Sequence, residues 1–237
     1  FADTTDNPAT ESLVQRSEIS IIDYTGGSEF GNWVEANAEN AMVYTEKSGI
    51  NSIIIDSVED MRAVSGNIGF SLCLYSGQMC TTPQNIFIPR DGIETSEGSL
   101  SFEDVAASIV KSVDWMLSDP ARASEVLGAI QNPVTADRVD RVSGTVLRDS
   151  ELVAHEMFSD ARTRSIKIIQ LDANDSNEYE KEMFGPIVYI IATDSTDQSI
   201  GLASSIATQH GAISCSVYST NQDIIDHAVD AMTLAGV

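Results

Sequence analysis

Glu18-Ile19-Ser20-Ile21-Ile22-Asp23-Tyr24, followed at once by Thr25-Gly26-Gly27, is the segment from which the fold class follows. A short β-branched run that ends in glycines is typical of a buried strand. We expect a helix over residues 29–37, capped by Ser28, and a second strand at Met42-Val43-Tyr44-Thr45. Strand, glycine turn, helix and strand form a βαβ unit, which implies parallel strands and an α/β fold.

The rest of the chain continues this alternation of short apolar runs and amphipathic stretches. Further strands are predicted at residues 51–56, 86–88, 165–171, 186–192 and 212–218. Helices are predicted after Ser57 with Asp60, over residues 102–117 behind Ser101, and over 121–129 and 135–146. Two more are predicted to start at Asp194 or Ser195 and at about Asn221. Residues 1–17 are polar and are expected to be loose, and 172–181 to form an acidic loop. The sequence predicts a mostly parallel sheet with flanking helices.

The composition limits the partners of this protein. A chain of 237 residues can form one large domain or two small ones, and 42% apolar residues is ordinary for a globular protein. The net charge of −23 argues against nucleic acid and anionic membranes as partners, because both attract positive charge. A solvated acidic surface explains the charge without a cationic substrate.

Cys73, Cys80 and Cys215 are too few, and odd in number, for a disulfide framework. They favour a reducing, cytoplasmic setting. No apolar run has the length of a membrane span. The histidines and cysteines do not have metal-ligand spacing, so no metal site is predicted.

Cys80 stands in Tyr75-Ser-Gly-Gln-Met-Cys-Thr-Thr-Pro-Gln-Asn85, between an apolar helix-like segment and a strand. A loop between rigid elements can present a nucleophile to a substrate. A free cysteine is also often a small buried hydrophobe, and the spacing alone favours that reading. Cys73 adjoins the apolar face of the preceding helix, and we expect it in the core.

Four motifs in this order resemble those of aldehyde dehydrogenases. They are Tyr24-Thr-Gly-Gly-Ser-Glu29, Thr45-Glu-Lys-Ser-Gly49, Gly77-Gln-Met-Cys80 and Glu182-Met-Phe-Gly-Pro186. The resemblance implies that residues 1–46 are the tail of a Rossmann-like dinucleotide-binding domain and that residues 47–237 are a thiol-bearing catalytic domain. It also implies a fragment, with the rest of the cofactor domain and the C-terminal oligomer contacts absent. The sequence from Gly77 to Asn85 is most similar to that of the PaaN-type proteins, the branch associated with phenylacetate degradation.

The resemblance implies a role for six residues. Cys80 would be the nucleophile, and Glu46, which lies 34 positions earlier, the base that activates water. Gly26 and Gly27 would lie near the cofactor pyrophosphate, and Glu182 and Phe184 would contact its ribose and nicotinamide. The chain departs from the family at Gly27, where serine is usual, and at two positions after Glu46, which are Lys47 and Ser48.

The implied reaction is oxidation of an aldehyde to an acid through a cysteine thiohemiacetal and thioester, with NAD or NADP as cofactor. The acidic loop before Glu182 disfavours a second phosphate and so leans toward NAD. The family likeness implies a homo-oligomer for the full-length protein and an inactive fragment. Two alternatives stay open: a cofactor-independent thiol acyltransferase or thioesterase-like module, and a non-catalytic remnant.

Overall fold

The computed structural model describes residues 9–237, and the chain divides into two compact units after Gly49. The domain boundary predicted after Glu46 falls inside a strand of the first unit. The first eight residues of the predicted dinucleotide-binding tail lie outside the described residues. Residues 10–14, expected to be loose, form a short helix, α1 (Thr10–Val14).

The first unit contains the predicted βαβ arrangement. Strand β1 (Ile21–Gly26), helix α2 (Ser28–Asn37) and strand β2 (Met42–Lys47) follow one another, and the two strands pair in parallel. The first strand begins three residues later than predicted. Ser28 is not the cap of α2: Gly27 takes that position, and the Ser28 hydroxyl donates to the carbonyl of Ser48 at 2.8 Å. That bond ties the start of the helix to the chain that leaves β2.

The second unit is built on a six-stranded sheet with the order β11-β3-β5-β10-β9-β8. The strands are β3 (Asn51–Ile55), β5 (Pro83–Pro89), β8 (Thr145–Arg148), β9 (Lys167–Asp172), β10 (Ile187–Thr193) and β11 (Cys215–Tyr218). All pairs are parallel except β8 with β9. The prediction of a mostly parallel sheet with flanking helices is confirmed.

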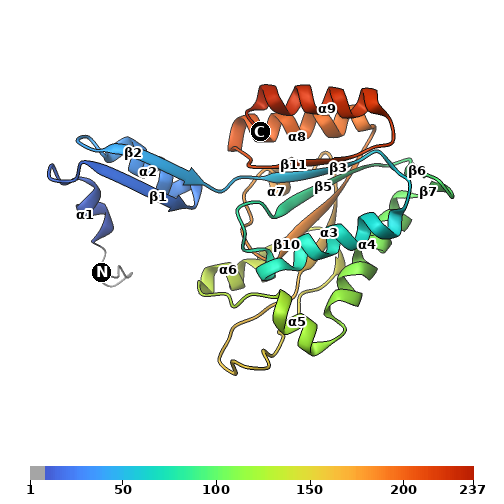
Figure 1. Ribbon diagram of the computed structural model, residues 1–237, viewed down its shortest axis with the longest axis horizontal. Coiled ribbons are helices and arrows are strands. Elements are labelled where there is room, and N and C mark those ends of the chain that lie inside the picture. Colours follow the sequence, from blue (N-terminus) through green and yellow to red (C-terminus); the bar gives the residue numbers. More distant parts are fainter. Residues whose placement is uncertain (1–8) are drawn as a thin grey trace. The chain divides into compact units, whose positions relative to one another are not determined.

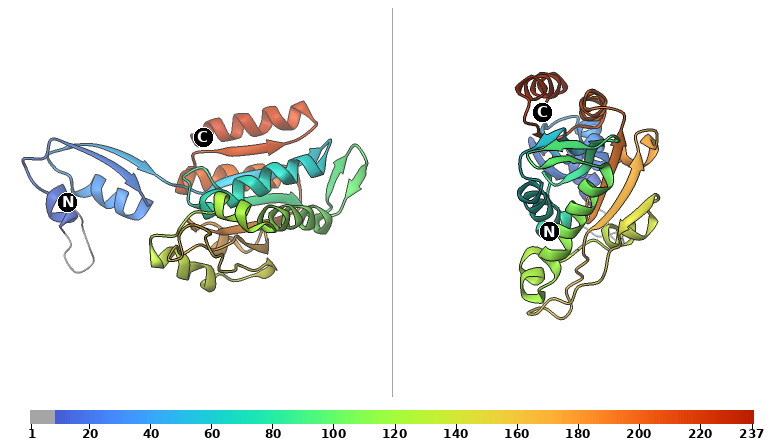
Figure 2. Two further views of the ribbon diagram at one scale, coloured as in Figure 1. Left: turned by 60° about the horizontal axis from the view of Figure 1, so that its bottom comes forward. Right: turned by 90° about the vertical axis from the view of Figure 1, so that its right-hand side faces the viewer.

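Helices cover both faces of this sheet (Figures 1 and 2). On one face lie α3 (Met61–Cys73), α4 (Phe102–Leu117) and α5 (Pro120–Val126), and on the other α8 (Thr196–His210) and α9 (Gln222–Ala235). Strand β5 alternates between the two cores: Ile86 and Ile88 pack toward α3, and Phe87 toward α8. Strands β3, β5 and β10 are buried along their whole length, which explains their near-continuous apolar sequences.

Several local predictions are wrong. Helix α3 starts at the Asp60 cap, and Ser57 instead belongs to strand β4 (Ser57–Val58). The sequence reading missed β6 (Ile93–Thr95) and β7 (Gly98–Leu100), which with β4 form a three-stranded sheet. The acidic loop contains helix α7 (Ser176–Tyr179).

The helix predicted over residues 135–146 is much shorter. Helix α6 (Pro133–Arg138) passes into a 3₁₀ turn, η2 (Val139–Arg141), and the chain then forms β8. Thr145 and Val146 pair with β9, so strand pairing outweighs the local helical spacing. Gly144 turns the chain with a φ of +126°, a value that only glycine adopts readily.

The fold gathers the candidate site of the second unit at one edge of its sheet. Asn51 begins β3, Cys80 lies just before β5, and Gly185 lies just before β10. Because these strands are parallel neighbours, their amino ends lie at the same edge. The edge therefore brings together segments more than a hundred residues apart in the chain.

Candidate active site

Cys80 is the exposed thiol among the three cysteines, which are all free. It lies in a turn between the 3₁₀ segment η1 (Leu74–Gly77) and β5. The side chain of Gln78 helps to close this turn, since its amide nitrogen donates to the carbonyls of Tyr75 at 2.9 Å and Ala129 at 3.3 Å. The turn presents Cys80 to solvent on a hydrogen-bonded support.

The other two thiols are held protonated by burial. Cys73 is fully buried, and desolvation raises the pKa of its thiol to about 12. Desolvation likewise raises the pKa of the half-buried Cys215 to about 11. The prediction that Cys73 belongs to the core is confirmed, and neither thiol is suited to nucleophilic work near neutral pH.

The backbone before Cys80 is left-handed at three consecutive residues. Tyr75, Ser76 and Gly77 have φ values of +52°, +56° and +67°. The buried Ser76 hydroxyl holds this turn by donating to the carbonyls of Gly128 at 3.1 Å and Arg164 at 3.0 Å. Such a conformation is costly for Tyr and Ser and persists because the surroundings impose it.

Gly77 brings two of the sequence motifs into contact. A Cβ placed on Gly77 would lie 2.4 Å from the carbonyl oxygen of Gly185, far inside van der Waals distance. The Gly-Gln-Met-Cys turn therefore packs directly against the Glu182–Pro186 segment, which only glycine allows.

Glu182 and Phe184 are both half-buried in that segment. Oε1 of Glu182 is buried and has no hydrogen-bond partner within residues 9–237. The carbonyl of Phe184 accepts a hydrogen bond of 2.8 Å from the Arg138 guanidinium, which fixes the backbone beside the Phe184 ring. A buried carboxylate oxygen without a partner is costly, so this position favours a hydrogen-bond donor from a ligand.

Glu46, Gly26 and Gly27 lie in the first unit. Glu46 is exposed and lies within β2, paired with Thr25, so the prediction that it follows the strand is wrong by a short margin. Gly27 caps α2, and no side chain of residues 9–237 caps that helix end. A Cβ on Gly27 would meet nothing within 4 Å, so the backbone there is open to approach. The first-turn N–H groups of α2 can therefore donate hydrogen bonds to an anion.

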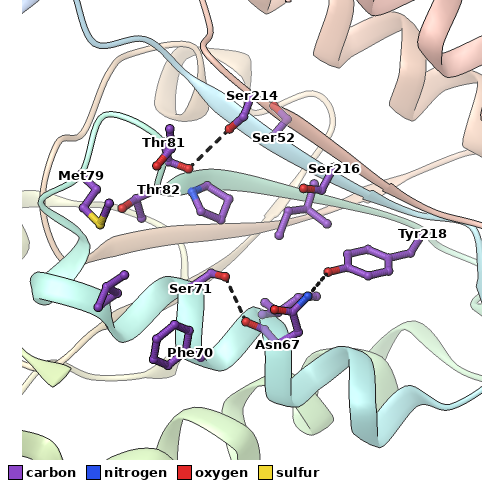
Figure 3. Close-up of a pocket in the computed structure, with 14 residues that line it drawn as sticks. Ser52, Asn67, Phe70, Ser71, Met79, Thr81, Thr82, Ser214, Ser216 and Tyr218 are labelled. Carbon is purple, nitrogen blue, oxygen red and sulfur yellow. Dashed lines mark hydrogen bonds between the residues drawn. The ribbon is translucent and has the colours of Figure 1, made fainter.

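A polar pocket lies beside the cysteine turn (Figure 3). It was not predicted from the sequence. It has a volume of about 180 Å³ and lies between α3, the Met79–Pro83 segment and β11. Its wall carries the hydroxyls of Ser52 and Thr82, which are buried and have no hydrogen-bond partner in the described part of the chain. The sequence pattern that could have indicated it is the alternation of Ser214, just before β11, with Ser216 and Tyr218 in β11.

The described residues contain no group of three or more His, Cys, Asp or Glu side chains placed to hold a metal ion. Within the same residues, no helix is both long and apolar enough to cross a bilayer.

Comparison with known proteins gives the same family for nearly the whole chain. A family model described as the aldehyde dehydrogenase family matches residues 4–237. The chain is 26% identical over 200 residues to N-succinylglutamate 5-semialdehyde dehydrogenase of Burkholderia multivorans, covering 82% of this chain and 40% of that protein. It is 21% identical over 225 residues to aldehyde dehydrogenase family 7 member B4 of Arabidopsis thaliana, covering 91% of this chain and 41% of the relative.

Solved structures agree. The NAD-dependent aldehyde dehydrogenase from Burkholderia multivorans is 50% identical, with a TM-score of 0.93 over 96% of this chain and 41% of that one. The NADP-dependent glyceraldehyde-3-phosphate dehydrogenase from Bacillus halodurans, complexed with NADP, shares the fold at 17% identity, with a TM-score of 0.68 over 95% of this chain and 46% of that one. The chain thus spans about two fifths of the length of the relatives it matches.

Proposed function

Because the chain belongs to the aldehyde dehydrogenase family, we propose that the intact gene product oxidises an aldehyde to a carboxylic acid with NAD or NADP, using Cys80 as nucleophile and Glu46 as base. The observation that carries the proposal is the packing of the exposed Cys80 turn, through Gly77, against the segment that holds Glu182 and Phe184. That packing brings the turn that carries the exposed thiol of Cys80 against the segment that carries Glu182 and Phe184.

Cys80 begins the chemistry. Its thiolate sulfur forms a bond to the carbonyl carbon of the aldehyde, and the carbonyl oxygen becomes an oxyanion. The backbone N–H of Cys80 is the candidate donor to that oxyanion. The product on the enzyme is a thiohemiacetal, which loses hydride more readily than a neutral aldehyde does.

Each unit, taken by itself, carries residues that fit part of a dinucleotide. The unpartnered Oε1 of Glu182 can accept a hydrogen bond from a ribose hydroxyl, and the open end of α2 at Gly27 can receive a phosphate, with Gly26 before it. Phe184 lies in the same segment as Glu182 and is half-buried, so its ring is a candidate apolar contact. When bound, NAD or NADP supplies the hydride acceptor, and the acidic residues near Glu182 lean toward NAD.

Glu46 completes the reaction. Cys80 carries the acyl group as a thioester, and water must attack its carbonyl carbon. The Glu46 carboxylate takes a proton from that water, the carbon–sulfur bond breaks, and the thiolate leaves with its electron pair. The products are the free acid and regenerated Cys80.

The test uses the intact gene product and a broad aldehyde panel, with reduced nicotinamide as the readout. We expect Cys80→Ala to abolish turnover. Glu46→Gln should release about one reduced nicotinamide per active site and then stall, because the thioester accumulates. Glu39→Gln, an exposed carboxylate in the same unit, is the matched control and should behave as the unmodified protein. Ester hydrolysis without any dinucleotide-dependent oxidation would instead support a thiol acyltransferase or thioesterase-like module.

Two narrower statements belong to the same proposal. The first is that the substrate comes from aromatic catabolism of the phenylacetate type. The resemblance of the segment from Gly77 to Asn85 to the phenylacetate-degradation branch supports it. Residues 1–237 alone are inactive, which is supported by their covering 41% of the NAD-dependent relative. Comparing kcat/KM for aromatic and aliphatic aldehydes tests the first, and assaying residues 1–237 beside the intact product tests the second.

The cellular setting and partners are also proposed. Three free thiols support a reducing, cytoplasmic location. The net charge of −23 supports small-molecule rather than nucleic-acid or membrane partners. Homo-oligomer formation by the intact product is supported by family likeness, and its mass in solution tests it.

A further inference from the structure

Gln84 holds the backbone on both sides of Glu182. Its side chain lies in β5 and is 6% exposed. The amide nitrogen donates to the carbonyl of Lys181 at 2.9 Å, and the amide oxygen accepts from the N–H of Met183 at 2.6 Å. The first of these groups belongs to the peptide before Glu182 and the second to the peptide after it.

The amides of Gln84 and Asn85 make further hydrogen bonds to the segment before Glu182. The Gln84 amide nitrogen also lies 3.2 Å from the carbonyl of Tyr179, which accepts a second bond of 3.1 Å from Asn85. Both amides project from the strand that begins three residues after Cys80. The segment before Glu182 is therefore fixed to the strand that carries the candidate nucleophile.

The fixed backbone contrasts with the free carboxylate. Oε1 of Glu182 is buried without a hydrogen-bond partner in residues 9–237, although the peptides on either side of it are satisfied. Binding groups that are held in place before the ligand arrives lose less freedom on binding. The arrangement is that of a carboxylate held in position for a hydroxyl donor.

We propose that Gln84 is a positioning residue for the dinucleotide: it fixes Glu182 on the Cys80 strand so that cofactor and nucleophile keep one spacing. This inference rests on the proposed role of Glu182 as a cofactor contact. Glutamine suits the task because one planar amide both donates and accepts. Glutamate could accept from Met183 but could not donate to Lys181, and it would add a charge beside Glu182.

A double-mutant cycle tests the inference in the intact gene product. Gln84→Met keeps the bulk of the side chain and removes its hydrogen bonds to Lys181, Met183 and Tyr179. Gln84→Ala is the second variant if the first is poorly soluble. We expect Gln84→Met to raise the dissociation constant for the dinucleotide about tenfold, by analogy with the loss of an outer-shell partner of a metal ligand, which costs about 10–100-fold in affinity. In the Glu182→Ala background the same change should add nothing, because Gln84 acts through Glu182.

The alkylation rate of Cys80 without dinucleotide separates positioning from general loosening. We expect Gln84→Met to leave that rate unchanged, as Gln209→Ala on the exposed face of α8 should. Additive losses in the cycle, or a slower Cys80 with equal loss of stability, would overturn the inference. If Glu182→Ala weakens dinucleotide binding and Gln84→Met does not, only this inference falls. If Glu182→Ala has no effect, the cofactor role of Glu182 falls and this inference falls with it.

Discussion

The side-chain amide of Asn51 donates a hydrogen bond of 2.7 Å to the backbone carbonyl of Cys80. The same amide reaches the carbonyl of Thr82 at 3.2 Å, and its oxygen accepts from the N–H groups of Ile213 and Ser214, both at 2.9 Å. One side chain, 2% exposed, thus joins the cysteine turn to the start of β11 and leaves no polar atom of its own without a partner. Amides satisfied on all sides in this way rigidify their surroundings.

Replacing Asn51 by Ala should therefore lower the free energy of unfolding by roughly 2–3 kcal/mol, because buried carbonyls and N–H groups lose their partners. Asn67→Ala is the matched control. Asn67 is exposed, and its side-chain amide donates a hydrogen bond of 3.0 Å to the Tyr218 hydroxyl, so its loss should cost less than about 0.5 kcal/mol. Urea unfolding of both variants measures the difference. Equal losses would mean that Asn51 adds nothing beyond a surface contact.

Gly77→Ala should be among the most damaging glycine substitutions in the second unit. The new Cβ would sit 2.4 Å from the Gly185 carbonyl, and the φ of +67° is itself unfavourable for alanine. Gly66→Ala is the control, since Gly66 lies in α3 with nothing within 4 Å of its Cβ position, and the change should stabilise by about 0.5–1 kcal/mol. Thermal unfolding of the two variants should shift in opposite directions, and a shift in the same direction would refute the packing of Gly77 on Gly185.

Local signals account for what the sequence predicted well. Helix α4 runs from Phe102 to Leu117 as expected, because Ser101 accepts from the N–H of Asp104 and the apolar residues keep helical spacing. Those interactions span one turn of chain and can be read without the rest of the fold. The βαβ unit of residues 21–47 and the strands of the central sheet follow from equally short patterns.

The support of the candidate site could not be predicted, since it depends on distant partners. Asn51 bonds to residues 29 and 162 positions away, and Gln84 to one 97 positions away. The only local hint was a polar pair, Asn51-Ser52, at the head of an isoleucine run. Strand β8 was missed for the same reason, because its partner β9 and not its own sequence makes it a strand.

Two buried tyrosines differ in one hydrogen bond. The Tyr179 hydroxyl donates to the carbonyl of Ala173 at 2.6 Å, whereas the Tyr189 hydroxyl has no partner within residues 9–237. Tyr179→Phe should therefore cost about 1 kcal/mol, while Tyr189→Phe should be neutral or stabilising. Each variant is the control for the other, because both rings are fully buried. Equal costs in urea unfolding would argue that Tyr189 is hydrogen-bonded in solution.

The chain should lose stability above about pH 9. Burial raises the pKa of Cys73 to about 12 and that of Cys215 to about 11, from an ordinary value of 9.0. Desolvation also raises the pKa of Tyr179 and Tyr189 to about 12, from 10.0. The unfolded chain releases these protons at a lower pH than the folded chain does. The stability that these groups contribute is therefore fully present below pH 9 and falls as the pH rises toward 12.

Urea midpoints measured at intervals from pH 8 to pH 11 test this window. Each group that titrates only in the unfolded state should contribute a slope of up to about 1.4 kcal/mol per pH unit. Tyr189→Phe removes one such group and should flatten the decline above pH 10. A midpoint that stays constant to pH 11 would contradict the burial of these groups.

Brief alkylation at pH 7–8 should label Cys80 first. Cys80 is exposed, while Cys73 and Cys215 are shielded and their raised pKa values keep them protonated. At pH 9 the thiolate fraction would still be only about one in a thousand for Cys73 and about one in a hundred for Cys215. Peptide mapping of the three rates measures this directly.

Cys80→Ser should leave the folded chain nearly unlabelled, and in strong urea the rates of the three cysteines should converge. Fast labelling of Cys215 in the folded protein would show that β11 opens readily, and the Asn51 contacts that hold its start would then be weaker than their geometry implies.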